Sequence, residues 1–167
     1  MKKIIINISL VFTLMLISDS GFSQNYSEQA KVYFSKYLDS KSYFDLCINS
    51  LPTLEDCSMV FNKENAYTFY GYIVDLKKNM RNQQKTELEK YADIKVGSFS
   101  ISDISQGKGN YAGGMKNIVN KLQPNVVFYN ITLLREIGNT SGISYEYWVK
   151  IEGRWVFFPK PWRIFSS

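Results

Sequence analysis

The last third of the chain alternates apolar and polar residues over long stretches, and this pattern restricts the fold more than any other feature of the sequence. Every second residue from Val127 to Leu133 is apolar, and the same holds from Ile143 to Ile151. A period of two is typical of β-strands that bury one face. The sequence therefore predicts an antiparallel meander with its apolar face on a core.

A third strand is predicted from Trp155 to Phe158, joined to the second by a tight turn. With Gly153-Arg154 as the two central residues of the turn, Ile151 lies opposite Val156. A turn at Glu152-Gly153 would instead place Ile151 opposite the charged Arg154. We therefore expect the turn at Gly153-Arg154.

The pairing of the first two strands follows from the same reasoning. If Ile137 lies opposite Ile143, then Ile131 lies opposite Val149. In this register the apolar side chains of all three strands lie on the same face of the sheet.

The other side of the predicted sheet carries a candidate binding surface, formed by Trp148, Lys150, Trp155 and Phe157. Large aromatic side chains on one side of a sheet need a cover. One interpretation is that the segment 159–165 or the long helix packs over them. The alternative is a surface that binds a partner, a second copy of the chain or a glycan.

The first part of the chain is predicted to be helical. Apolar residues recur at spacings of three and four from Ala30 to Leu38, and a short helix is expected from Lys41 to Asn49. Thr53 can accept a hydrogen bond from the Asp56 amide, which predicts a helix start there. The longest helical pattern runs from Ala66 to Met80.

The strand before the meander changes phase along its length. Ile94 and Val96 alternate in one phase and Phe99 and Ile101 in the other, with Gly97-Ser98 between them. This slip predicts a β-bulge.

A glycine-rich segment, residues 105–114, follows and leads into a short helical patch from Met115 to Leu122. One interpretation is an anion cradle at a helix N-terminus. Because the spacing of a phosphate loop is not met, a mobile surface loop is favoured.

Cys47 and Cys57 flank Leu51-Pro52, so a chain reversal between two helices could join them in a disulfide. The alternative is a pair of buried thiols that act as small hydrophobic side chains.

The N-terminus has the features of a secretory signal peptide over residues 1–23: a basic start, an apolar stretch from Ile4 to Ile17, and small residues in Gly21-Phe22-Ser23. The apolar stretch is too short to span a membrane and no Cys follows it, so we expect no stable membrane anchor. Residues 24–167 are expected to form one domain that is secreted or periplasmic.

Composition excludes several kinds of chemistry. The chain has no His and two Cys, which rules out a His-based catalytic triad, a His-ligated metal and a zinc site made of several Cys. We therefore expect no cofactor. Removal of the leader lowers the formal net charge from +5 to about +4, a mild excess without the dense basic cluster of a nucleic-acid-binding protein.

The order of elements is helices, a strand, a long loop and three antiparallel strands, with a terminal hairpin that contains Gly153-Arg154-Trp155. It resembles the cone-shaped α+β domains of the nuclear transport factor 2-like and SnoaL-like superfamily. The resemblance implies N-terminal helices packed on a curved antiparallel sheet of about four strands, around a helix-lidded pocket. This scaffold serves isomerases and dehydratases as well as non-catalytic binding and dimerisation modules.

The predicted inner face offers four polar pocket candidates: Tyr129, Arg135, Tyr145 and Tyr147. The resemblance implies that an enzyme would need an acid or base there, usually Asp or His, and neither type falls on that face. Our first hypothesis is a non-catalytic exported domain that binds a small ligand or a protein partner, or forms a homodimer through the sheet.

Two alternatives stay open. One is a small pocket enzyme, an isomerase, dehydratase or hydrolase, with Asp or Tyr as base. The other is a secreted inhibitor or effector that acts on a cell-envelope target through the basic line of Lys77, Arg81 and Lys85.

Overall fold

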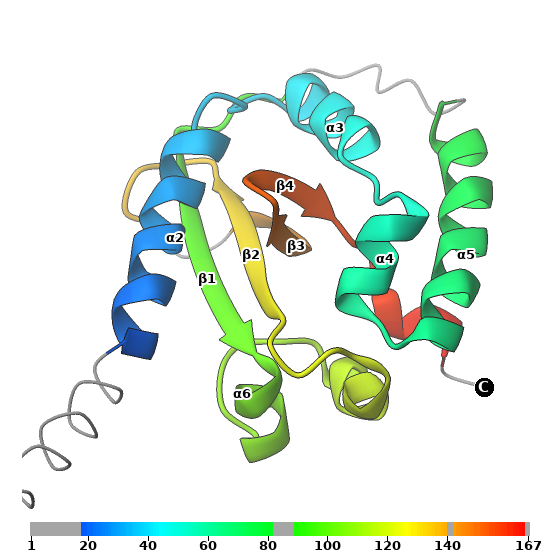
Figure 1. Ribbon diagram of the computed structural model, residues 1–167. Coiled ribbons are helices and arrows are strands. Elements are labelled where there is room, and N and C mark those ends of the chain that lie inside the picture. The colour runs from blue at the N-terminus through cyan, green and yellow to red at the C-terminus, as the bar shows by residue number, and fades with distance from the viewer. Residues whose placement is uncertain (1–17, 82–88, 140–141, 166–167) are drawn as a thin grey trace, which may run out of the picture.

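The computed structural model describes residues 18–81, 89–139 and 142–165, so most of the predicted leader and Lys85 lie outside the described residues. The fold is α+β, with helices followed by a four-stranded antiparallel sheet, as predicted (Figure 1). None of the helices in the described ranges combines the length and the apolar character needed to cross a bilayer.

The sheet is a meander in which strands adjacent in the chain are also adjacent in space, in the order β1-β2-β3-β4. The predicted strands of the last third are all present. The bounds are β1 (Asp93–Ser100), β2 (Val127–Leu134), β3 (Gly142–Ile151) and β4 (Arg154–Phe157).

Within the described residues, four helices precede the sheet: α2 (Ser18–Phe34), α3 (Ser40–Asn49), α4 (Leu54–Val60) and α5 (Lys63–Arg81). The last three lie close to the predicted positions, whereas α2 begins and ends earlier in the chain than the predicted pattern from Ala30 to Leu38. Between β1 and β2 lie α6 and the 3₁₀ helix η1, and a second 3₁₀ helix, η2, follows β4. Their bounds are α6 (Ile101–Gln106), η1 (Gly113–Lys121) and η2 (Pro161–Ile164).

Two of these helices begin with a capping box. The Thr53 hydroxyl accepts from the Asp56 amide at 3.2 Å, as predicted, and the Asp56 carboxylate accepts from the Thr53 amide at 2.9 Å. Ser100 and Asp103 make the same pair of bonds at the start of α6. Helix α6 was not predicted from the sequence, although Ser100 and Asp103 have the same spacing and the same residue types as the helix start at Thr53 and Asp56.

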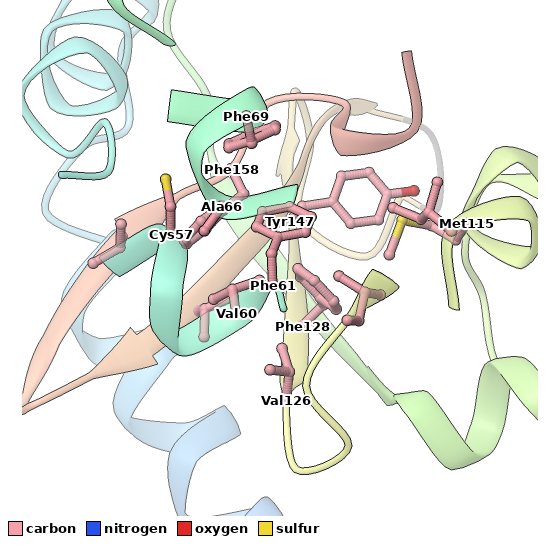
Figure 2. Close-up of a cluster of buried hydrophobic side chains, with 14 of the residues drawn as sticks. Cys57, Val60, Phe61, Ala66, Phe69, Met115, Val126, Phe128, Tyr147 and Phe158 are labelled. Atoms are coloured by element: carbon pink, nitrogen blue, oxygen red, sulfur yellow. The ribbon is translucent and has the colours of Figure 1, made fainter. Parts of the chain in front are cut away.

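Both faces of the sheet are buried, in two separate hydrophobic cores. The first, the α4/α5 core, lies beneath α4, α5 and the two 3₁₀ helices (Figure 2), and its aromatic members are Phe61, Phe69, Phe99, Phe128, Tyr147 and Phe158. The second, the α2/α3 core, lies beneath α2 and α3, and its largest members are Phe34, Tyr43, Tyr91, Tyr129, Trp148, Trp155 and Phe157. The sequence predicted one buried face of the sheet, whereas in the structure both faces are buried.

A β-bulge in β3 explains how the two cores divide the strands. Ile131 pairs with Tyr145 and Tyr129 pairs with Trp148, so three residues of β2 lie opposite four residues of β3. The extra residue is accommodated at Tyr147, whose φ is +76°. Tyr147 and the residues after it in its phase therefore face the α4/α5 core, while Ile131 faces the α2/α3 core. The predicted pairing of Ile131 with Val149 is wrong.

The turn between β3 and β4 also differs from the prediction. Ile151 pairs with Arg154, so the central residues are Glu152 and Gly153, with φ of +47° and +82°. A type I′ turn requires positive φ at both positions, and Gly153 adopts it without steric cost. Arg154 then reaches across to the buried Asp56 and forms a bidentate ion pair with it. The charge of Arg154, which was the reason to expect the other register, is thus paired with a carboxylate of α4.

The bulge predicted in β1 is absent. Pairing with β2 is unbroken from Asp93 opposite Leu134 to Ser100 opposite Val127. Ile94 packs in the α2/α3 core and Phe99 in the α4/α5 core. The change of phase in the sequence therefore reflects a strand that is covered on both faces.

Residues 105–110 of the glycine-rich segment are exposed at the surface, as predicted, and the later part of the segment is hydrogen-bonded to the sheet. Ala112 donates its amide to the Tyr147 hydroxyl at 3.0 Å, and Asn130 donates its side-chain amide to the Asn110 carbonyl at 2.8 Å. Gly114 lies against Trp162, where a Cβ atom would approach the indole to 2.2 Å. The segment thus packs against the rest of the fold at its C-terminal end.

Cys47 and Cys57 are both buried and are not joined by the predicted disulfide. Cys47 of α3 points into the α2/α3 core, whereas Cys57 of α4 points into the α4/α5 core. The alternative interpretation, two buried thiols that act as small hydrophobic side chains, describes the structure.

Candidate functional site

The predicted aromatic surface is buried. Trp148, Trp155 and Phe157 are 0%, 5% and 8% exposed. Phe34 of α2 covers the two indoles, with ring centroids 4.7 Å from Trp148 and 5.4 Å from Trp155. The cover is thus α2 with α3, and neither the C-terminal segment nor the long helix provides it. Of the four predicted surface residues, Lys150 is the one that is half-buried rather than buried.

The four predicted pocket residues do not meet in one pocket. Tyr129 and Tyr145 lie on the side of the α2/α3 core, and the bulge places Tyr147 on the other side of the sheet. Arg135 is exposed just after β2, where its guanidinium lies 3.4 Å from a carboxylate oxygen of Glu89. The structure therefore separates these residues into three places.

Tyr129 and Tyr147 are buried and Tyr145 is half-buried, which favours the neutral form of each phenol. Burial raises the pKa of Tyr129 to about 12, and it also raises the pKa of Tyr145 and Tyr147. A phenol with a raised pKa stays protonated at neutral pH.

A groove opens at the point where β2 and β3 separate. The last paired residues are Tyr129 and Trp148, and no register pair among the described residues continues toward Val127 and Lys150. The groove, here called the β2–β3 groove, has a volume of about 580 Å³. It is lined by Tyr26, Ser58, Met59, Val60, Gln123, Pro124, Asn125, Val126, Val127, Tyr129, Val149, Lys150, Ile151 and Glu152.

A second cavity of about 400 Å³ lies against α2, here called the α2 cavity. Lys150 lines both openings, so the two lie on either side of its side chain. Each opening carries an accessible apolar side chain: Met59 in the β2–β3 groove is 39% exposed, and Val32 in the α2 cavity is 65% exposed. The α2 cavity also has polar lining residues, namely Glu28, Gln29 and Lys36.

Lys150 is held in place by packing. Its ammonium lies 4.8 Å from the centroid of the Trp155 ring, which is cation–π geometry. Burial lowers the pKa of this amine from its ordinary value. The ion pairs formed within the described residues use Lys78, Arg135 and Arg154, and none of them involves Lys150.

Acidic groups contribute little to the groove. Among the described residues that line it, Glu152 carries the sole carboxylate, and this residue is exposed in the β3–β4 turn. Asp39 and Asp103 have lowered pKa values because they accept hydrogen bonds from Ser42 and Ser100, and both cap helices. In the described parts of the chain, no three acidic or cysteine side chains gather as metal ligands would.

Sequence reasoning identified Lys150 and Tyr129 but missed the rest of the groove. Met59 comes from α4, and the opposite wall comes from residues 123–127 ahead of β2. These walls meet at the groove because β2 and β3 separate there. The alternation of apolar and polar residues along a strand does not indicate where its pairing with the next strand ends.

The arrangement is a surface groove with apolar walls and one amine at its side, which suits binding of an apolar body by packing. We compared the chain with protein-family models, with curated proteins and with solved structures, and none of the three comparisons gave a match.

Proposed function

We propose that this chain is a non-catalytic binding domain whose ligand occupies the β2–β3 groove. The observation that carries the proposal is the open groove of about 580 Å³ where β2 and β3 separate. Its volume falls within the range of about 300 to 1,000 Å³ that is common for small-molecule sites. Exposed apolar walls such as Met59 lose contact with water when a ligand packs on them, which favours binding.

Binding is favoured over catalysis by the chemistry of the lining. A pocket enzyme of the SnoaL-like type would need a desolvated acid or base aimed at the substrate. In the described lining the carboxylate of Glu152 is exposed, and Tyr129 has a pKa raised to about 12. Neither group is a desolvated acid or base aimed into the groove, because Glu152 is exposed in a turn and Tyr129 stays protonated.

The proposal includes export and a relationship to the nuclear transport factor 2-like group. Export is supported by the basic and apolar start of residues 1–23. The relationship is supported by helices that precede an antiparallel meander with a terminal hairpin. If a homodimer forms, it would use an edge of the sheet or its covering helices, because both faces of the sheet are buried.

Filling the groove tests the proposal. Ser58→Trp places a large ring in the groove from an exposed position on α4. We expect it to weaken binding of the neutral fluorescent dye Prodan by about tenfold or more, since the ring takes the space of the ligand. The measurement is a titration of dye emission against the protein.

Ser105→Trp is the matched control. Ser105 is also exposed on a short helix, and its hydroxyl also donates to the carbonyl four residues before it, as that of Ser58 does. Because it lines neither cavity, it should leave dye binding unchanged. Equal loss in both variants, or no dye binding by the native chain, would contradict the proposal.

Export has its own test. N-terminal sequencing of material recovered outside the cytoplasm should start near Gln24, and an intact Met1 would exclude cleavage.

A further inference from the structure

We infer that the ligand of the β2–β3 groove is an anionic amphiphile, with a carboxylate or phosphate head at the Lys150 ammonium and an apolar chain along the groove. This inference rests on the proposed function and adds the charge and shape of the ligand.

The first step is the position of the lysine. Lys150 lines both the β2–β3 groove, which has apolar walls, and the α2 cavity, whose lining also includes Glu28 and Lys36. A ligand in either opening can place a polar head against the same amine. The chain contributes no other cation to the β2–β3 groove among the described lining residues.

The second step is the electrostatic state of that amine. The Trp155 ring lies beneath it at 4.8 Å, and the ring face compensates only part of the hydration that burial removes. The three described ion pairs engage other cations, so Lys150 keeps its capacity to pair with an anion. A charge-assisted bond from a ligand head would restore the lost solvation in a partly desolvated place.

The third step is the character of the walls. Val126 and Val127 approach from one side of the groove, Met59 from α4, and Ile151 from β3. These side chains offer dispersion contacts to a hydrocarbon chain but no further charge. The polar lining residues Tyr26, Ser58, Gln123 and Asn125 also offer hydrogen bonds to a ligand. Among the described lining residues Lys150 is the group that pairs with an anion, so an alkyl chain with one anionic end uses both the apolar walls and the amine.

The experiment compares ligands of one chain length with different heads. Decanoate, decyl phosphate, decanol and decyltrimethylammonium are titrated below their micelle concentrations by calorimetry into the full chain after leader removal. We expect the native protein to bind at least one of the two anions about tenfold more tightly than decanol, and the cation most weakly. Which anion binds better distinguishes a carboxylate source from a phosphate source.

Two substitutions locate the effect. Lys150→Gln should reduce the ratio of anion to decanol affinity to about one, and Lys150→Arg should retain a preference for anions because it keeps the charge. Lys95→Gln removes an exposed lysine of β1 that lines neither opening, and it should leave every affinity as in the native chain.

The outcomes separate this inference from the proposed function. Equal affinities of decanol and both anions for the native protein would overturn the inference while dye binding still supports the groove. An anion preference that survives in Lys150→Gln would overturn it as well. Failure of Prodan and of all four amphiphiles to bind would overturn both.

Discussion

The two cores of this molecule bury opposite faces of one sheet, yet they treat polar atoms differently. In the α4/α5 core the Tyr147 hydroxyl accepts a bond from the Ala112 amide, and the rings of Phe69 and Phe158 stack with centroids 5.7 Å apart. In the α2/α3 core the Tyr43 hydroxyl and the Trp148 indole N–H are buried without a hydrogen bond of good geometry, and outside this core the same holds for Asn130 Oδ1 among the described residues. Burial raises the pKa of Tyr43, and the nearby Trp148 opposes this only in part.

The β2–β3 groove borders both cores, whereas the α2 cavity borders the α2/α3 core. Val60, Val126, Val149 and Ile151 of the α4/α5 core line the groove together with Tyr129 of the α2/α3 core, and Trp155 of the α2/α3 core lines the α2 cavity. The α2/α3 core also buries two polar atoms that make no hydrogen bond, which lowers its net contribution to stability. We therefore expect the α4/α5 core to contribute more to stability and the α2/α3 core to be more tolerant of change.

The largest expected effect is a direct test of this contrast. Phe128→Ala in the α4/α5 core should lower the free energy of unfolding by about 3 to 5 kcal/mol, because a fully buried ring is replaced by a cavity. Phe34→Ala removes an equally buried ring from the α2/α3 core and should cost less by about 1 kcal/mol or more, because this core borders the α2 cavity and the groove, toward which the structure can relax. Urea unfolding measures both values, and equal costs would refute the contrast.

A smaller effect on the free energy of unfolding is expected from the N-terminal caps of two helices, one beside each core. Asp39 caps α3 beside the α2/α3 core, and Asp103 caps α6 beside the α4/α5 core. Hydrogen bonds from Ser42 and Ser100 lower the two pKa values below the ordinary 3.8. The unfolded chain then binds more protons at acidic pH, so this stabilisation is present above about pH 4 and is lost as the pH falls through the lowered folded values.

Asp39→Ala and Asp103→Ala should therefore each cost about 1 kcal/mol at pH 7 and much less near pH 2. Unfolding of each variant and of the native chain at a series of pH values measures the difference. A cost that does not change with pH would mean that the carboxylate charge is not what stabilises the helix start.

The smallest perturbation uses the two thiols as reporters without any substitution. Burial raises the pKa of Cys57 to about 12, and both side chains are inaccessible in the folded state. We expect slow alkylation by iodoacetamide under native conditions, with Cys47 modified before Cys57 because the α2/α3 core opens more readily. Peptide mass spectrometry of timed samples gives the order, and simultaneous modification or an intact disulfide would contradict it.

The register of the sheet shows how far sequence patterns can be followed. The predicted turn at Gly153-Arg154 is shifted from the observed Glu152-Gly153, yet Trp155 and Phe157 still share a face with Trp148, because the pairing moved by two positions. The pairing of β2 with β3 failed more seriously, because a single extra residue at Tyr147 moves every later side chain to the other face. Glycine commonly marks such a position, and this one has tyrosine.

The candidate site also contains residues that the sequence pointed to and residues that it did not. Lys150 stood out in the sequence as a cation among aromatic residues, and the structure places it over Trp155 beside the groove. Met59 and Val126 could not be found, because they reach the groove through the packing of α4 and of the segment before β2.

The amino-acid sequence by itself determined α3, α4 and α5, the strands, their antiparallel order and the cap at Thr53, because periodicity and capping act over a few neighbouring residues. The tertiary structure alone decided that α2 and α3 cover the aromatic face, that Cys47 and Cys57 enter different cores, and that β2 and β3 separate into a groove. These outcomes depend on contacts between segments far apart in the chain, where burial of one surface competes with burial of another.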